Sequence, residues 1–289
     1  MTPMYFLTLY QTELVKLFRR LTSHFGLSLS LLFGVLGPVL VLLFNWLNQM
    51  AADAAAEMPD QPPSIEIDAL TAEWAVWFAF FLRGLLFLPI LIFIMGGLTF
   101  AAEHANRSIR EYALRPVPRW SLILSRWLAL ASWVFLACVV TFGTSLLLGM
   151  IFTGSIGEWQ SACKDVGVAI AADLGFATLA LSIAVFTRSV SATVASLVSV
   201  FVLQVLLWVG LGIAGNTLFR MWLENMLSGQ AFIIDWFFWF VEYLSLWQPP
   251  FVVASSTGGA SWQGFFTLFV IAFGSLLAAL VRFQRMDLP

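Results

Sequence analysis

The sequence predicts an all-α polytopic membrane protein, and three observations carry that prediction. Of the 289 residues, 61 % are hydrophobic and only 10 % are charged, whereas about 25 % are charged in soluble domains. The mean hydropathy is +0.92. Several apolar segments also reach the length of about 20 residues that a helix needs to cross a bilayer. A soluble protein of this size could not cover its surface with so few charged side chains.

The first predicted element is an amphipathic helix over residues 4–22. Its apolar residues recur at helical spacing, and Lys16, Arg19 and Arg20 lie among its polar positions. A basic amphipathic helix is suited to lie in the inner membrane surface. It would serve either as a plain anchor or as a coupling element. The apolar run that follows is too long for a signal peptide, so we expect an uncleaved first span.

Six segments are then predicted to span the membrane, within one transmembrane domain that covers residues 1–289. They are residues 25–47, 74–101, 127–151, 166–187, 191–214 and 263–282. A further apolar stretch lies within the outer segment 216–262, but it carries Asp235 and Glu242. Each carboxylate costs about 2.5–3.5 kcal/mol at a helix centre in the bilayer. This stretch is therefore predicted as a short interfacial or re-entrant helix in the last outer loop.

The basic residues predict the orientation. Eleven of the 14 Lys and Arg residues lie in the N-terminal segment, the C-terminal tail and the loops on one side of the predicted spans. Because Lys and Arg concentrate in cytoplasmic loops, both termini are predicted to be cytoplasmic. We expect a multi-pass protein of the bacterial plasma (inner) membrane. The few cations, most of them beside apolar segments, argue against nucleic acid as a partner.

Two charges lie inside predicted spans. Arg83 and Asp173 are each about 10–14 Å from the outer end of their segment, at 1.5 Å per residue. An unpaired charge at this depth is costly, so we expect either an ion pair between the two helices or a contact of Arg83 with an anionic substrate group. Gln204 would make interhelical hydrogen bonds or line the same path.

Catalytic and cofactor signals are weak in this sequence. Two cysteines, Cys138 and Cys163, and two histidines are too few for a typical metal site. Among carboxylates, Asp173 alone lies well inside a predicted span, which argues against an intramembrane enzyme. The sequence also contains no Gly-x-x-x-x-Gly-Lys-Ser/Thr phosphate loop. We therefore expect neither catalysis nor a bound metal or cofactor in this chain.

The inner loop over residues 103–120 is the most distinctive segment. Residues 103–114 contain no Gly or Pro and can form three helical turns. The sequence Arg115-Pro116-Val117-Pro118 then stops the helix, because the residue before each proline is pushed out of the α region. A short charged helix between two spans is suited to dock into a partner. Alternatively, this loop does no more than set the topology.

This order of elements resembles the permease subunits of ABC-2 type transporters. The places of the family's inner-loop pattern are filled by Glu103, Ser108, Ile109, Pro116, Val117, Arg119 and Arg126. Arg107 stands where the family usually has Gly, and Pro118 where it often has Ser. The turn at residues 246–251 and the ending at 282–288 also resemble the family's tail.

The resemblance implies a permease subunit of an ATP-driven exporter. A separate cytoplasmic ABC ATPase would bind ATP and Mg, and two permease chains, identical or different, would form the translocation path. The helix over 103–114 would couple to the ATPase, with residues 187–191 as a second inner contact. The implied coupling residues are Glu103, Arg107, Ser108, Arg110, Glu111, Arg115 and Arg119. An alternative is a membrane anchor or assembly factor for an extracytoplasmic enzyme or partner, with residues 216–262 as its docking surface.

Overall fold

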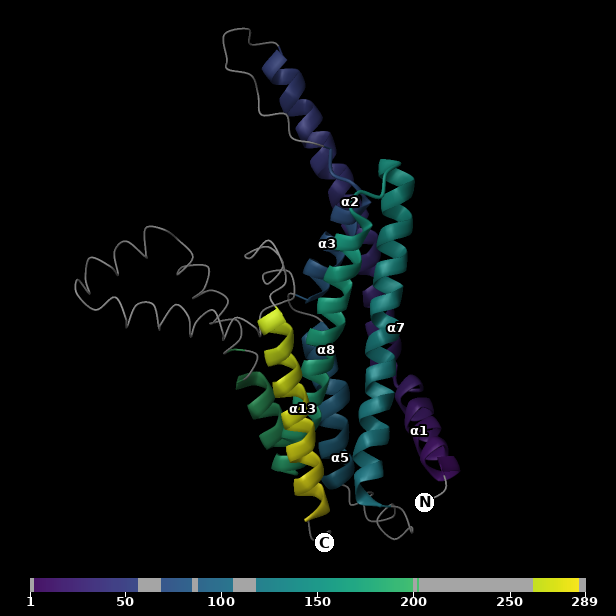
Figure 1. Ribbon diagram of the computed structural model, residues 1–289, viewed down its shortest axis with the longest axis vertical. Coiled ribbons are helices and arrows are strands. Elements are labelled where there is room, and N and C mark those ends of the chain that lie inside the picture. Colours follow the sequence, from purple (N-terminus) through teal and green to yellow (C-terminus); the bar gives the residue numbers. More distant parts are fainter. Residues whose placement is uncertain are drawn as a thin grey trace, which may run out of the picture.

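The computed structural model describes residues 3–56, 69–84, 88–105, 118–199, 202 and 262–285, which form helices and turns without strands. The helices pack side by side as an elongated bundle (Figure 1). In chain order they are α1 (Pro3–Phe18), α2 (Leu21–Ala56), α3 (Ala72–Leu82), α4 (Leu88–Phe93), the π-helix η2 (Ile94–Leu98), α5 (Thr99–Ala105), α7 (Arg119–Thr153), α8 (Trp159–Thr187), the helix Val190–Ser199 and α13 (Trp262–Gln284).

Within the part of the chain that the structure describes, three helices are long and apolar enough to cross a membrane: Leu21–Asp53, Arg119–Thr153 and Ala162–Thr187. They contain the predicted spans 25–47, 127–151 and 166–187. At 1.5 Å per residue, the 36 residues of α2 and the 35 residues of α7 extend over about 50 Å. Both helices therefore reach well beyond a hydrocarbon core of about 30 Å.

The predicted second span, 74–101, is helical in its described residues but is not a regular α-helix. These residues form α3, α4, η2 and α5, with wide π turns at Arg83–Gly84 and along η2. Pro89 has no N–H to donate to the preceding turn, and the Gly96–Gly97 pair within η2 weakens regular helix. These residues explain why the regular α-helical hydrogen bonding gives way to π turns here. Such π turns recur at functional sites in other helices.

The last two predicted spans are described to different extents. α13 covers the whole of the segment predicted at 263–282. Of the segment predicted at 191–214, the structure describes residues 191–199 and 202. The outer segment 216–262 falls outside the described residues except for its last residue, which begins α13. The six-span topology remains a prediction.

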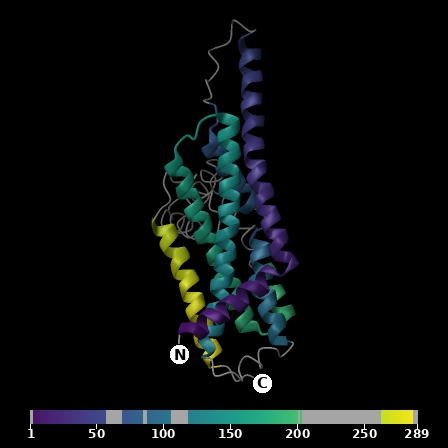
Figure 2. The same cartoon turned by 90° about the vertical axis from the view of Figure 1, so that its right-hand side faces the viewer.

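The packing of the bundle is centred on α7 and α8. α2 packs against α3 and α7, α1 lies against α7, and α13 packs against α8. α1 and the last turn of α13 lie at the same end of the bundle, and two perpendicular views agree on this (Figures 1 and 2). We call this the inner end, following the predicted orientation.

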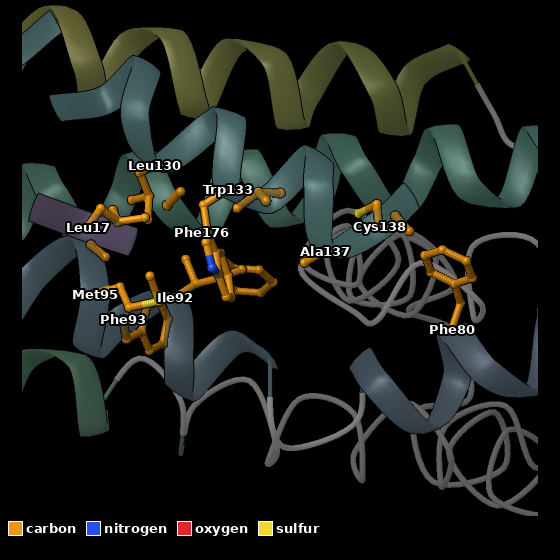
Figure 3. Close-up of a cluster of buried hydrophobic side chains, with 14 of the residues drawn as sticks. Leu17, Phe80, Ile92, Phe93, Met95, Leu130, Trp133, Ala137, Cys138 and Phe176 are labelled. Atoms are coloured by element: carbon orange, nitrogen blue, oxygen red, sulfur yellow. The ribbon is translucent and has the colours of Figure 1, made fainter. Parts of the chain in front are cut away.

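Buried side chains fill the interior between these helices. One cluster of apolar residues is contributed by α1, α3, α4, η2, α7 and α8 (Figure 3). A second cluster joins α5, α7, α8 and α13 at the inner end. α2 and α3 approach so closely that a Cβ added at Gly37 would lie 2.2 Å from the carbonyl oxygen of Ala75. Only glycine permits this approach.

The N-terminal helix α1 packs against other helices of the bundle, which a helix that only lies in the membrane surface does not require. α1 ends at Phe18, not at residue 22, because the chain turns at Arg19 and Arg20 into α2. The Tyr10 hydroxyl hydrogen-bonds the Ser132 hydroxyl of α7 at 2.7 Å, and the side chain of Leu17 is buried in the core. One face of the amphipathic helix is thus covered by protein.

Candidate functional site

The inner end of the bundle contains both borders of the predicted coupling segment. α5 ends at Ala105, two residues after Glu103. α7 begins at Arg119, directly after Pro118, whose backbone is extended with φ −61° and ψ 135°. Prolines are restricted to such a φ value, so Pro118 fixes the direction in which the chain enters α7. Residues 106–117 lie outside the part of the chain that the structure describes.

Five charged side chains meet beside these borders, and we call them the inner charge cluster: Glu13, Lys16, Arg20, Glu103 and Arg126. Arg126 lies at the centre, and its guanidinium is held between two carboxylates. Its Nε is 3.4 Å from Glu13 Oε2, and its Nη2 donates a hydrogen bond to Glu103 Oε2. The same guanidinium lies 5.0 Å from the centre of the Phe100 ring.

Two further cations complete the cluster from the side of α1. Lys16 Nζ donates to Glu13 Oε1 at 2.9 Å, and Arg20 Nη2 donates to Glu103 Oε1 at 3.4 Å. The cluster therefore joins α1 and the turn after it to α5 and to α7. Removing one partner from a buried ion pair is strongly destabilising. These contacts hold three elements together next to the segment 106–117.

The sequence-predicted coupling residues fall into three groups. Glu103 lies in the inner charge cluster, so its carboxylate is engaged within the chain. Arg119 is exposed and donates from Nη1 to the carbonyl oxygen of Gln284 at 3.4 Å, which joins α7 to the end of α13. The remaining coupling residues lie outside the described residues, as does Gln204; they are Arg107, Ser108, Arg110, Glu111 and Arg115.

The second inner contact predicted from the sequence, residues 187–191, forms a compact turn. Arg188 ends α8 in the left-handed region with φ 54°, and its N–H donates to the carbonyl oxygen of Ala184. The hydroxyl groups of Thr187 and Thr193 hydrogen-bond each other at 2.6 Å across the turn. Ala184 also belongs to the apolar cluster that includes Phe100, near the beginning of α5. The turn is therefore at the inner end, as the coupling segment's borders are.

Arg83 and Asp173 form an ion pair inside the bundle. Arg83 Nη2 donates to Asp173 Oδ2 at 2.7 Å, and the two residues are 1 % and 6 % exposed. The Arg83 guanidinium also lies 5.1 Å from the centre of the Phe80 ring. The same Nη2 is 3.1 Å from the Cys138 sulfur, which donates to Asp173 Oδ2 at 3.7 Å.

Sequence reasoning did not find the place of Cys138. The thiol lies beside the ion pair at one end of the buried apolar cluster, near Phe80 (Figure 3). Cys138 lies on α7, whereas Arg83 caps the end of α3 and Asp173 lies on α8. The thiol reaches the ion pair because of the rotation of α7 about its own axis. Among the described residues, no group of three or more His, Cys, Asp and Glu side chains is arranged to hold a metal ion.

A comparison with protein families decides what these elements belong to. Residues 9–209 match the family model described as ABC-2 family transporter protein. The chain belongs to the ABC-2 transporter family. The matched range runs from α1 into the fifth predicted span, so it contains the inner charge cluster, the Arg83–Asp173 ion pair and the whole of segment 103–120.

Membership of the ABC-2 family makes this chain a permease of an ABC transporter. Permeases of this family are typically non-enzymatic transmembrane components. The apolar helices of this chain agree with a multi-pass membrane protein. A search of curated proteins found no match to the chain.

Proposed function

We propose that the chain is the permease subunit of an ATP-driven exporter, that two permease chains form its translocation path, and that a separate cytoplasmic ATPase drives it through segment 103–120. The observation that carries this proposal is the ABC-2 family match, which includes that segment together with the helices on both sides of it. The ATPase subunit would bind ATP and Mg, since this chain has no phosphate loop.

The contacts around the segment support a role in transmitting movement. Glu103 precedes residues 106–117 on α5, and Arg126 follows them on α7, and the two side chains are hydrogen-bonded. A displacement of the segment would therefore act on α5 and α7 together. Through Glu13, it would also act on α1.

α7 would carry such a displacement to the opposite end of the bundle. It is a continuous helix from Arg119 to Thr153. At its far end, the carbonyl oxygens of Ser155 and Ile156 accept hydrogen bonds from the backbone of Ala72 and Glu73, where α3 begins. Helix shifts of this kind underlie many switching transitions. In this proposal, closure of the ATPases at the inner end rearranges α3, and with it the Arg83–Asp173 pair.

Site-specific photo-crosslinking in native membranes tests the proposal. A photoreactive residue replaces Arg110 in the coupling segment, or Ser155 at the opposite end of α7 as the matched control. We expect an adduct with a protein that carries an ABC ATPase phosphate loop from position 110, and none from position 155. Equal adducts from both positions, or an ATPase adduct from position 155 alone, would contradict the proposed coupling side.

A further inference from the structure

The outer end of α3 is held by the loop between α7 and α8. The N–H of Ala72 donates to the carbonyl oxygen of Ser155 at 3.2 Å. The next N–H, that of Glu73, donates to the carbonyl oxygen of Ile156, also at 3.2 Å. In return, the Glu73 carboxylate accepts a hydrogen bond at 2.9 Å from the N–H of Glu158, which directly precedes α8. The first N–H groups of a helix have no partner within it, so these contacts supply acceptors at the start of both helices.

The loop fits against α3 only because position 157 is a glycine. Gly157 has a φ of +73°, and a Cβ added there would overlap the hydroxyl oxygen of Thr71. Gly154 has a similar φ of +70°, but no atom of the described residues lies within 4 Å of its added Cβ. Positive φ values favour glycine at both positions, whereas the close contact with α3 requires it only at Gly157. We call the contacts of residues 71–73 with residues 155–158 the outer clip.

Inward of the outer clip, α3 lies against α7 on small side chains. Ala72, Ala75 and Ala79 are fully buried. A Cβ added at Gly149 of α7 would lie 3.0 Å from the Cβ atoms of both Ala72 and Ala75. Small residues let helices approach closely, without the interdigitation that large side chains give. At its other end, α3 passes at Arg83 into π turns, where helices commonly bend.

A buried polar group lies inward of the outer clip, and each of the three helices that meet there supplies one member: Arg83 of α3, Cys138 of α7 and Asp173 of α8. These residues are 1 %, 0 % and 6 % exposed. They lie about 16–21 Å from the clip, at 1.5 Å per residue along the helices. Arg83 Nε is buried, and no described residue accepts a hydrogen bond from it. A buried N–H without an acceptor is costly, and water that entered from the outer end would supply one.

We propose that the outer clip is an outer gate. When its hydrogen bonds break, the outer end of α3 moves away from α7 and α8, and α3 bends at Arg83–Gly84. Water and the transported solute then reach Arg83, Cys138 and Asp173 from the outer side. The inference deepens the proposed function and rests on it for the transported solute. The opening of the gate to water can be tested without solute or ATPase.

The reactivity of Cys138 in spheroplasts tests the gate. In a Cys163→Ser background Cys138 is the only thiol, and a buried thiol is inert. A small membrane-impermeant methanethiosulfonate is added outside. The test variant is Gly157→Ala, and its matched control is Gly154→Ala, which has the same unfavourable φ but no contact with α3. We expect Cys138 to react about tenfold faster in the test variant than in the control, which corresponds to about 1.4 kcal/mol in the gate equilibrium.

A second pair of variants covers the case in which Gly157→Ala does not fold. Glu73→Ala removes the acceptor of the Glu158 N–H. Its control, Glu158→Ala, keeps that N–H and removes a carboxylate that makes no capping hydrogen bond. Cys138 should again react about tenfold faster in the test variant, which corresponds to the same 1.4 kcal/mol.

Equal Cys138 rates within either pair of folded variants would overturn the proposal. A Cys138 that reacts only with reagent added to the inner side would overturn it as well. The exposed Cys163 of the otherwise unchanged chain, labelled in parallel, shows that the reagent reaches the outer end. No ATPase takes part in this experiment, so a failure of the gate is distinguishable from a failure of the proposed coupling.

Discussion

Replacement of Asp173 by Asn should destabilise the bundle strongly, because it leaves Arg83 buried without a counter-charge. The Arg83 Nη2 to Asp173 Oδ2 distance is 2.7 Å, and the two residues are only 1 % and 6 % exposed. Breaking a buried pair by removing one partner costs about 3–5 kcal/mol. One kcal/mol shifts the melting temperature by about 2–4 °C in a chain of comparable size. We therefore expect the Asp173→Asn variant to melt about 6–20 °C below the wild-type protein.

The assay is thermal unfolding of the purified chain in mild detergent, followed by tryptophan fluorescence. Asp53→Asn is the matched control, since Asp53 is an exposed carboxylate on α2, and it should shift the melting temperature by no more than about 2 °C. The double variant Arg83→Gln/Asp173→Asn has no buried charge left in this pair. It should regain much of the stability that either single variant loses, because the effects of substitutions at two contacting residues on stability are not additive.

Two results would refute this reasoning. One is an Asp173→Asn variant as stable as the Asp53→Asn control. The other is a double variant whose loss equals the sum of the two single losses, since additive losses are expected of residues that do not interact. Either result would favour the second hypothesis, that Arg83 lines the path and meets an anionic substrate group.

Two further predictions concern packing and orientation. Gly37→Ala should cost about 1–3 kcal/mol, because the added Cβ would lie 2.2 Å from the Ala75 carbonyl oxygen. Gly143→Ala, with nothing within 4 Å of its added Cβ, is the control in the same unfolding assay, and equal losses would show that the close approach of α2 and α3 is wrong. A membrane-impermeant maleimide added outside intact spheroplasts should label the exposed Cys163 and not the buried Cys138. Labelling of Cys163 only after the membrane is opened would reverse the predicted orientation.

The long helices could be predicted from sequence because a bilayer demands long apolar runs. The runs at 25–47, 127–151 and 166–187 all lie within continuous helices. The π turns within 74–101 were not predicted. Pro89 and the Gly96–Gly97 pair were visible in the sequence, but whether such residues bend a helix or widen it into π turns depends on the neighbours that satisfy the freed backbone groups.

Contacts between helices were harder to predict than the helices themselves. A contact between Arg83 and Asp173 could be suggested from depth alone, since a buried charge needs a counter-charge at a similar level. The depth of a residue within its span does not give the rotation of the helix about its axis. The approach of Cys138 to the same ion pair could therefore not be predicted.

The inner charge cluster was missed for another reason. Glu13 lies in an amphipathic pattern that is typical of a helix on the membrane surface. That pattern does not indicate that other helices cover the face of α1 that contains Glu13. Glu103 was read through the family resemblance as a residue that faces a partner. The structure places both carboxylates against Arg126 instead, because a buried guanidinium needs acceptors nearby.

Copurification from native membranes tests the central claim most directly. The tagged wild-type chain is purified in mild detergent, and its partners are identified and quantified by mass spectrometry. We predict one ABC ATPase subunit, with its own phosphate loop, for each permease chain. The charge reversal Arg110→Glu/Glu111→Arg should lose the ATPase, while Arg282→Glu keeps it. An ATPase retained equally by both variants, or absent from the wild-type complex, would contradict the proposal that segment 103–120 couples this permease to ATP hydrolysis.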